Sequence, residues 1–199
     1  KIHFILASIF IKQERLQEAE ETLRRTIELN PNFPESYSNL GVILKNSNRS
    51  KEAELLTLKA IELKPDFAEA YSNLGNILRD LNQLEEAELS IRKAIDLKPD
   101  FAAAYSNLGN ILRDLDKTKE AEISYRKAIE INPNYADAAW NLYGLANTIK
   151  EAEEMINLCL TIDENYLKAK LTLSALKLHE GDPSLFYNFI KSTHKNHPY

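Results

Sequence analysis

Apolar and polar residues recur along this chain with the period of an α-helix. A helix that turns by about 100° per residue would place the apolar or small residues of segment 68–80 on one side: Ala70, Tyr71, Leu74, Gly75, Ile77 and Leu78. The residues between them are polar and would lie on the opposite side: Glu69, Ser72, Asn73, Asn76, Arg79 and Asp80. The pattern predicts an amphipathic helix with one buried and one exposed side.

The same pattern returns at a fixed distance. Residues 104–115 repeat residues 70–81 without change, and 36–47 are a weaker copy. Several residues recur every 34 positions, among them the glycines Gly41, Gly75 and Gly109 and the prolines Pro31, Pro65, Pro99 and Pro133. A constant period of this length predicts a stack of helical repeats, each burying its apolar side against its neighbours.

We number each repeat so that its glycine is position 8. This divides the single expected domain, 1–199, into repeats 1–33, 34–67, 68–101, 102–135, 136–166 and 167–199. The fifth repeat is three residues short near Thr148, and Tyr143 replaces its glycine, so we expect an irregular hairpin there. The sixth is degenerate, with Gly181-Asp182-Pro183 between its helices and Phe186, Tyr187 and Phe189 in its second helix.

Each repeat is predicted to be a hairpin of a helix A and a helix B. Helix A should begin after the proline, with a polar residue as N-cap: Asn32, Asp66, Asp100 or Asn134. It should end near Asn48, Asn82 and Asp116, which can also cap helix B. Position 8 glycines and small residues of helix B, such as Ala53, Ala87 and Ala121, would let the two helices approach closely.

The Tyr-x-x-Leu-Gly block, the mid-repeat alanine and the closing proline resemble the tetratricopeptide repeat (TPR) family. The arrays of O-GlcNAc transferase and of bacterial TPR proteins are similar. The resemblance implies an all-α, right-handed superhelical solenoid of antiparallel helix hairpins. It also implies that the polar side of helix A lines a concave groove in which family members bind peptides.

Position 6 carries asparagine in four successive repeats: Asn39, Asn73, Asn107 and Asn141. An amide side chain offers both a donor and an acceptor to a peptide backbone. The Ser-Asn-Leu-Gly-Asn blocks are similar to the asparagine ladder of O-GlcNAc transferase, which implies binding of an extended chain regardless of its sequence. The alternative is a row of merely solvated asparagines, and Ile5 and Thr172 interrupt the row at its ends.

Further candidates for peptide contacts lie on the same side of helix A. The uncharged ones are Ser72, Ser106, Asn76 and Asn110, and the charged ones are Lys45, Arg79, Arg113, Asp80 and Asp114. The cations could clamp acidic groups of a ligand, or the two signs could neutralise each other. Because exposed ion pairs contribute only about 0–1 kcal/mol, we favour the second interpretation.

The composition disfavours nucleic acid and the membrane as partners. With 25 Lys and Arg against 30 Asp and Glu, the net charge of −5 disfavours nucleic acid as a partner. Residues 2–11 are almost wholly apolar, but they are too few to span a bilayer. They also fall in register with the first helix A, with Leu6 and Phe10 at core positions, so we expect no membrane insertion.

No catalytic, metal or cofactor site is predicted. His194 and His197 have no carboxylate or cysteine at ligand spacing, and the single cysteine, Cys159, lies on an apolar helix side as an inert thiol. We find neither a glycine-rich phosphate loop nor a Ser/His/Asp set.

We therefore expect a non-enzymatic protein-interaction scaffold, cytoplasmic, that binds an extended peptide segment of another protein. The alternative is the substrate-recruiting arm of a larger glycosyltransferase, methyltransferase or sulfotransferase whose catalytic domain lies outside this chain. Lys1 begins in the middle of the repeat pattern, which favours a fragment of something longer. The ligand and the oligomeric state stay open.

Overall fold

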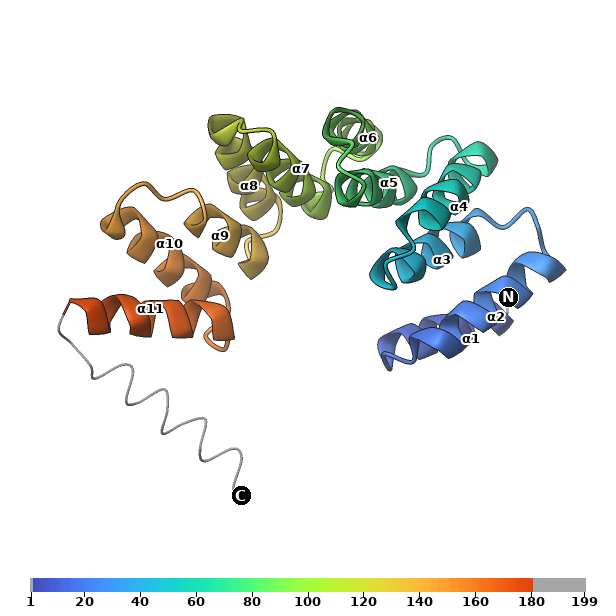
Figure 1. Cartoon of the computed structure of the whole chain (residues 1–199), viewed down its shortest axis with the longest axis horizontal. Coiled ribbons are helices and arrows are strands. Elements are labelled where there is room, and N and C mark those ends of the chain that lie inside the picture. The colour runs from blue at the N-terminus through green and yellow to red at the C-terminus, as the bar shows by residue number, and fades with distance from the viewer. Residues whose placement is uncertain (1, 181–199) are drawn as a thin grey trace, which may run out of the picture. The chain divides into compact units, whose positions relative to one another are not determined.

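The computed structural model describes residues 2–180 (without the side chain of Ile2), and this part is helical with no strand. It contains eleven α-helices joined by short turns (Figure 1), which confirms the predicted all-α fold. The helices are α1 (Ile2–Lys12), α2 (Leu16–Leu29), α3 (Pro34–Asn46), α4 (Ser50–Leu63), α5 (Ala68–Asp80), α6 (Leu84–Leu97), α7 (Ala102–Asp114), α8 (Thr118–Ile131), α9 (Ala136–Tyr143), α10 (Ile149–Ile162) and α11 (Leu167–His179).

The chain forms two compact units, 1–117 and 118–199, and each is described by itself. In the first unit, α1 to α6 form three A–B hairpins, followed by α7. Helices α3, α5 and α7 also pack against the B helices that precede them, α2, α4 and α6. The predicted features at 181–183, 186, 187 and 189 lie outside the described residues.

Aromatic residues, not the predicted polar ones, precede the A helices. The N-cap positions are Phe33, Phe67, Phe101 and Tyr135, and none makes a side-chain capping bond. The predicted N-caps Asn32, Asp66, Asp100 and Asn134 are therefore wrong; these residues lie one position earlier, in the turn. The reason is packing: the ring of Phe67 is buried and that of Phe33 packs edge-on against Phe4, so helix A begins only after the anchored aromatic residue.

Helix A ends at a residue in the left-handed conformation. Glu14, Asn48, Asn82 and Asp116 have φ of 58°, 58°, 60° and 60°. In the second repeat, the N–H of Asn48 donates to the carbonyl O of Lys45 (3.0 Å), and the N–H of Arg49 donates to that of Leu44 (2.9 Å). This is the Schellman arrangement, which satisfies the last carbonyls of a helix.

The prediction that Asn48 and Asn82 also cap helix B is wrong. The N-caps of α4 and α6 are Arg49 and Gln83, one residue later, and neither makes a side-chain capping bond. Asn48 and Asn82 lie at the end of helix A and do not cap helix B. Their N–H groups donate to carbonyls of helix A, and their positive φ angles belong to the turn that ends it.

The glycines at position 8 lie where helices A and B touch. A Cβ added to Gly75 would lie 2.5 Å from Cγ1 of Ile91 and 3.2 Å from the carbonyl O of Ala87. A Cβ on Gly41 would lie 2.3 Å from Oγ1 of Thr57. These distances confirm the predicted close contact between the helices of a hairpin.

The core of the first unit continues from one hairpin to the next. One buried cluster combines Ala19 and Leu23 of α2 with Leu40, Ile43 and Leu44 of α3. In α1, Phe10 packs partly buried against this cluster. The prediction that Leu6 also lies in the core is wrong: its side chain is exposed, because no described helix covers that side of α1.

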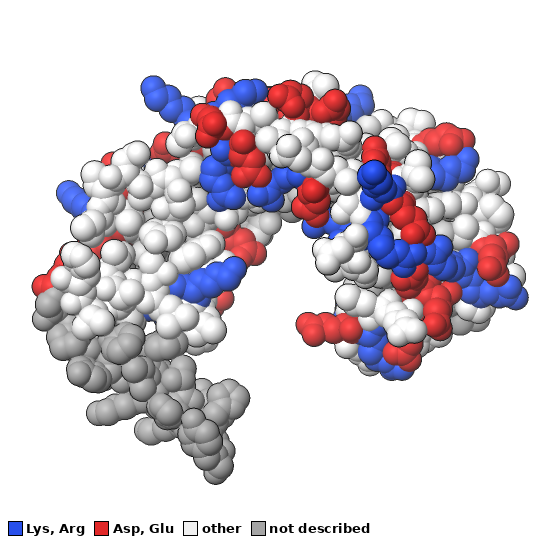
Figure 2. Space-filling view, in the orientation of Figure 1, with Lys and Arg blue, Asp and Glu red and all other residues white. Residues whose placement is uncertain are grey.

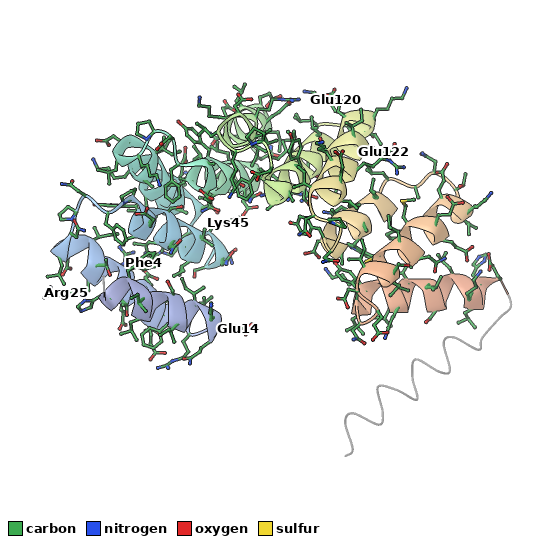
Figure 3. The ribbon with its side chains drawn as sticks, turned by 180° about the vertical axis from the view of Figure 1, so that it is seen from behind. Phe4, Glu14, Arg25, Lys45, Glu120 and Glu122 are labelled. Atoms are coloured by element: carbon green, nitrogen blue, oxygen red, sulfur yellow. The ribbon has the colours of Figure 1, made fainter. Side chains whose placement is uncertain are left out.

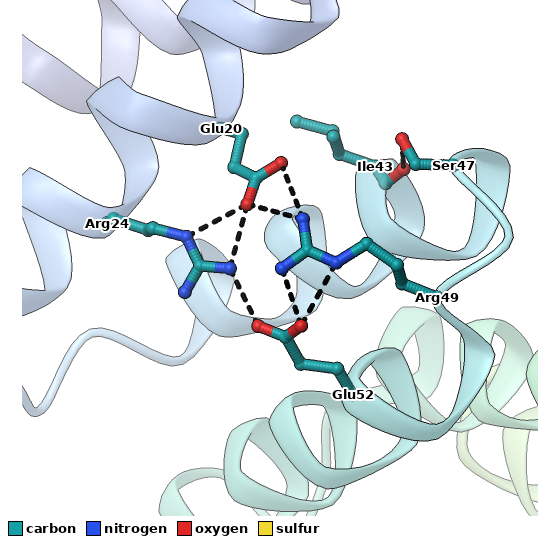
Figure 4. Close-up of polar contacts among 6 residues, drawn as sticks. All are labelled: Glu20, Arg24, Ile43, Ser47, Arg49 and Glu52. Carbon is teal, nitrogen blue, oxygen red and sulfur yellow. Dashed lines mark hydrogen bonds and ion pairs between the residues drawn. The ribbon is translucent and has the colours of Figure 1, made fainter.

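A closed ring of four charges joins the first two B helices at the surface (Figure 4). Arg24 contacts Glu20 and Glu52, both at 2.7 Å, and Arg49 contacts the same carboxylates at 2.9 and 2.6 Å. The hydrogen bond from Arg24 lowers the pKa of Glu52, against a smaller opposing effect of burial. Each charge has two partners of opposite sign, so this ring is held better than an isolated surface pair.

The second unit departs from the regular repeat as expected. Helix α9 has only 8 residues, and a turn leads to α10, where the Thr148 side chain accepts a hydrogen bond from the N–H of Glu151. Its core contains Ala139, Ile156, Cys159 and Ala169, with the ring of Trp140 packed against it. The shortened repeat thus keeps a core, and its helix B, unlike α4 and α6, begins with a side-chain cap.

We predict that Gly75→Leu destabilises the chain by about 1–3 kcal/mol or more, because Ile91 and the Ala87 carbonyl leave no room for a side chain. Urea unfolding measures the change. Gly144→Ala is the control, since Gly144 is exposed with φ −64°, which alanine adopts freely. An unchanged midpoint for Gly75→Leu would show that the two helices separate at low cost.

We predict that Ser36→Ala stabilises the chain by roughly 1 kcal/mol. Ser36 is fully buried and its hydroxyl has no hydrogen-bond partner, whereas the equivalent positions carry Ala70, Ala104 and Ala138. Removing an unsatisfied buried hydroxyl and adding a better helix former both favour folding. The matched variant Ser38→Ala should be destabilising instead, because Ser38 has a hydrogen-bond partner; thermal unfolding of both variants provides the comparison.

Candidate functional site

The candidate site is the polar side of three A helices in the first unit. Asn39 on α3, Asn73 on α5 and Asn107 on α7 occupy position 6, and we call them the asparagine row. All three side chains are half-buried. The fourth predicted member, Asn141, is half-buried on α9 and belongs to the second unit.

The asparagine row connects successive repeats. Nδ2 of Asn73 donates a hydrogen bond to Oγ of Ser38 (3.0 Å), and Nδ2 of Asn107 donates to Oγ of Ser72 (3.2 Å). Each bond joins position 6 of one repeat to position 5 of the repeat before it. These asparagines are therefore more than solvated surface, since they also hold neighbouring A helices together.

This contact leaves part of each amide for a ligand. An asparagine side chain has two N–H donors and one carbonyl acceptor, and the serine takes one donor. Oδ1 and the second N–H of Asn73 and Asn107 remain. Asn39 differs, because position 5 of the repeat before it is Phe4 (labelled in Figure 3), which has no hydroxyl. The ring of Phe4 packs against that of Phe33 instead.

The serines at position 5 do not face a ligand. Ser72 and Ser106 are only 3% and 2% exposed, so the prediction that they contact a peptide is corrected. Adjacent A helices pack against each other, and α5 covers this position of α3 as α7 covers it in α5. Sequence reasoning missed Ser38 and Ser72 as partners of the row, although serine stands at position 5 in each repeat that precedes a bonded asparagine.

The charged residues at positions 12 and 13 also pair across repeats. Nζ of Lys45 (labelled in Figure 3) lies 3.0 Å from Oδ2 of Asp80, and Nε of Arg79 lies 2.5 Å from Oδ2 of Asp114. The geometry favours the interpretation of mutual neutralisation. Arg113 is the exception: its Nε lies 3.8 Å from Asp114, a carboxylate already bound by Arg79.

Two further asparagines lie one turn of helix after the row. Asn76 on α5 and Asn110 on α7, both predicted to contact a peptide, are half-buried on the same helices. The first unit thus places amides at positions 6 and 9 and a cation at position 12 on each of α5 and α7. This arrangement places hydrogen-bond donors and acceptors along the same side of both helices.

Charges of both signs lie side by side on the face of the first unit that Figure 2 shows. Figure 2 shows Lys and Arg interleaved with Asp and Glu over the first unit. Much of this pattern consists of pairs one helical turn apart, such as Arg25 with Glu28 and Lys59 with Glu62, both at 2.7 Å.

The remaining candidates from the sequence are one cysteine and two histidines. Cys159 is buried, and burial raises the pKa of its thiol to about 11, so the reactive thiolate is scarce near neutral pH. In residues 2–180, no three His, Cys, Asp or Glu side chains are grouped as metal ligands. His194 and His197 lie outside the described residues. None of the helices in this range is long and apolar enough to cross a bilayer.

We predict that Asn73→Ala destabilises the chain by about 0.5–1.5 kcal/mol, because it removes a hydrogen bond and leaves the buried Ser38 hydroxyl unpaired. Asn39→Ala is the matched control, since Asn39 has no such serine partner. Urea unfolding should separate the variants, and equal midpoints would show that the bond to Ser38 adds nothing.

The comparisons with known families agree with the repeat pattern. Models described as "Tetratricopeptide repeat" match residues 1–33, 22–54, 56–88 and 102–135, and one described as "TPR repeat" matches 75–116. Together they cover most of the chain. A search of curated proteins finds no match.

Several solved structures are similar in fold. PilW, a type IV pilus biogenesis factor, has a TM-score of 0.83 at 19% identity over 100% of this chain and 93% of its own. PilF of Pseudomonas aeruginosa has a TM-score of 0.78 at 19% identity, over 99% and 91%. YrrB, described as a TPR protein with an unusual peptide-binding site, has a TM-score of 0.62 at 20% identity, over 86% and 90%. At sequence identities this low, the similarity is evidence for the fold alone.

Proposed function

The chain belongs to the tetratricopeptide repeat family, and from this premise we propose that it is a non-catalytic protein-interaction module that binds an extended segment of a partner along α3, α5 and α7. Family membership supports the general role of an interaction scaffold. The asparagine row carries the specific proposal, because it repeats the same hydrogen-bonding group on three successive A helices.

The row suits a peptide main chain. A backbone presents alternating N–H and C=O groups whatever its sequence, and an amide can pair with either. The bonds to Ser38 and Ser72 hold the amides of Asn73 and Asn107 in place before a ligand arrives. Groups that are ordered beforehand lose less conformational entropy on binding.

Charge has a smaller part in the proposed contact. The pairs Lys45–Asp80 and Arg79–Asp114 leave little net charge beside the row. Arg113 is less compensated, so an acidic residue of the ligand would be favoured near the end of α7. We therefore expect main-chain hydrogen bonds to dominate affinity, with a salt-dependent preference at Arg113.

A recruiting arm of a larger enzyme is the second candidate. It is favoured by the Ser-Asn-Leu-Gly-Asn blocks at 72–76 and 106–110, which are similar to those of O-GlcNAc transferase. Under this proposal the same surface would hold an extended substrate for a catalytic domain elsewhere. Both candidates require binding by the asparagine row.

The test is calorimetry with a partner peptide selected from a displayed library of random peptides. We predict that Asn73→Ala with Asn107→Ala weakens binding about 5- to 150-fold, because two hydrogen bonds of about 0.5–1.5 kcal/mol each are lost. The control is Asn30→Ala with Asn157→Ala, two exposed asparagines outside the row.

The double variant must be compared at a temperature at which it is fully folded, since each substitution also removes a contact between repeats. Circular dichroism verifies this. Equal affinity of the wild type and the folded double variant would exclude the asparagine row as the binding surface.

A further inference from the structure

The closed ring of charges in the first unit has an incomplete counterpart in the second. The ring between α2 and α4 alternates carboxylates and guanidinium groups (Figure 4): Glu20, Arg24, Glu52 and Arg49. Counted from the start of each B helix, the equivalent positions at α8 and α10 carry Glu122, Arg126, Glu151 and Thr148. Three of the four charges are kept, and the second cation is replaced by a neutral side chain.

The replaced cation has a defined contact in the first unit. Arg49, the residue before α4, lies 2.9 Å from Glu20 of α2. Lys117, the residue before α8, makes the same kind of contact, because its Nζ lies 2.8 Å from Oε2 of Glu88 on α6. The residue before a B helix thus supplies a cation to the fifth residue of the preceding B helix wherever this pair is formed.

Glu122, labelled in Figure 3, lacks such a partner. Its Oε1 accepts hydrogen bonds from Nε (3.0 Å) and Nη2 (2.8 Å) of Arg126, just as Oε1 of Glu88 accepts from Arg92. No residue in the described range 2–180 bonds its Oε2, the atom that corresponds to the one Lys117 reaches in Glu88.

A cavity of about 190 Å³ lies at this place in the second unit. Glu122 and Arg126 line it from α8, and Glu151 and Glu154 line it from α10. The shortened turn after α9 and the side of α10 provide an apolar wall: Leu142, Leu145, Ala146 and Met155. Because sites for small molecules usually have volumes of about 300 Å³ or more, this cavity suits a single side chain.

The lining selects a cationic side chain. Three carboxylates stand against one guanidinium group, and Glu154 has no hydrogen bond or ion pair with a described residue. An aliphatic stem can lie along an apolar wall while its charged end meets carboxylates. Arginine suits the place best, because one guanidinium can bond two carboxylates at once, as Arg49 does in the closed ring.

We propose that this cavity is a second binding site, which takes an arginine side chain of a partner protein in the role that Arg49 has in the closed ring. The guanidinium would bond Oε2 of Glu122 and the carboxylate of Glu151, and its stem would pack on the apolar wall. The cavity lies beside two B helices of the second unit, whereas the asparagine row lies on A helices of the first. The inference is therefore independent of peptide binding by that row.

The test is an NMR titration of the isotope-labelled 199-residue chain with a tripeptide that has arginine between two glycines and is blocked at both ends. We expect saturable shifts of the amide signals of residues 145–155. The same tripeptide with citrulline, which has nearly the shape of arginine without its charge, should leave these signals unchanged. Equal shifts with both tripeptides would overturn the proposal, and so would arginine-induced shifts confined to α3, α5 and α7.

Two substitutions in the lining should weaken binding. Glu151→Gln with Glu154→Gln should raise the dissociation constant of the arginine tripeptide at least about tenfold, because two of the three carboxylates lose their charge. Both side chains are exposed, and glutamine keeps an oxygen for the N–H of Asn147, so folding should be kept. Unchanged affinity would overturn the proposal.

The matched control is Glu54→Gln with Glu86→Gln, which removes as many charges at the junction of α4 and α6. The two cation positions there carry Leu58 and Gln83, so no ring is formed. The control should bind the arginine tripeptide as the wild type does, and an equal loss in both double variants would overturn the proposal in favour of general attraction by the acidic surface.

Thr148→Arg tests the site from within the chain. The introduced guanidinium would stand before α10 as that of Arg49 stands before α4, so it should complete the ring with Glu122 and compete with the tripeptide. We expect a rise of at least about tenfold in the dissociation constant of the arginine tripeptide. Wild-type affinity in this variant would show that the tripeptide does not take the place of the missing cation.

Discussion

The fold depends on how closely helix A can approach helix B within a hairpin. At Gly75 this approach leaves no space for a Cβ, because Ile91 and the Ala87 carbonyl lie within 3.2 Å of where it would be. Glycine inside a helix costs about 1 kcal/mol relative to alanine. That cost is offset by the apolar surface which the two helices bury together, and the next hairpin can then pack on the pair in the same way.

Polar contacts set the arrangement between hairpins. Between α3 and α5, Asn73 bonds Ser38 and Lys45 pairs with Asp80. The junction between α5 and α7 has the equivalent pair of links, one neutral and one ionic, on the polar side of helix A. The same side carries the proposed ligand site. The same side chains therefore join the repeats and form the proposed ligand site. For a substitution in the asparagine row, the free energy of unfolding and the dissociation constant must each be measured.

The burial of a position on helix A depends on whether a B helix packs against it from the repeat before. Leu40 and Leu6 occupy equivalent positions, yet the first is buried and the second exposed, because only α3 has a B helix packed before it. A repeat buries its apolar faces against neighbours rather than within itself.

The sequence by itself determined the helical class, the 34-residue period, the glycine contacts and the shortened fifth repeat, because each of these follows from residue spacing within one or two helices. It also located the side of helix A that carries Asn73 and Asn107. Only the tertiary structure decided that Ser72 is buried and that Phe67 rather than Asp66 precedes α5. Those outcomes depend on which helix of the next or preceding repeat lies against each position. The period of one helix tells on which side of that helix a residue lies. The packing of two helices decides which polar groups bond to each other and which remain for a ligand.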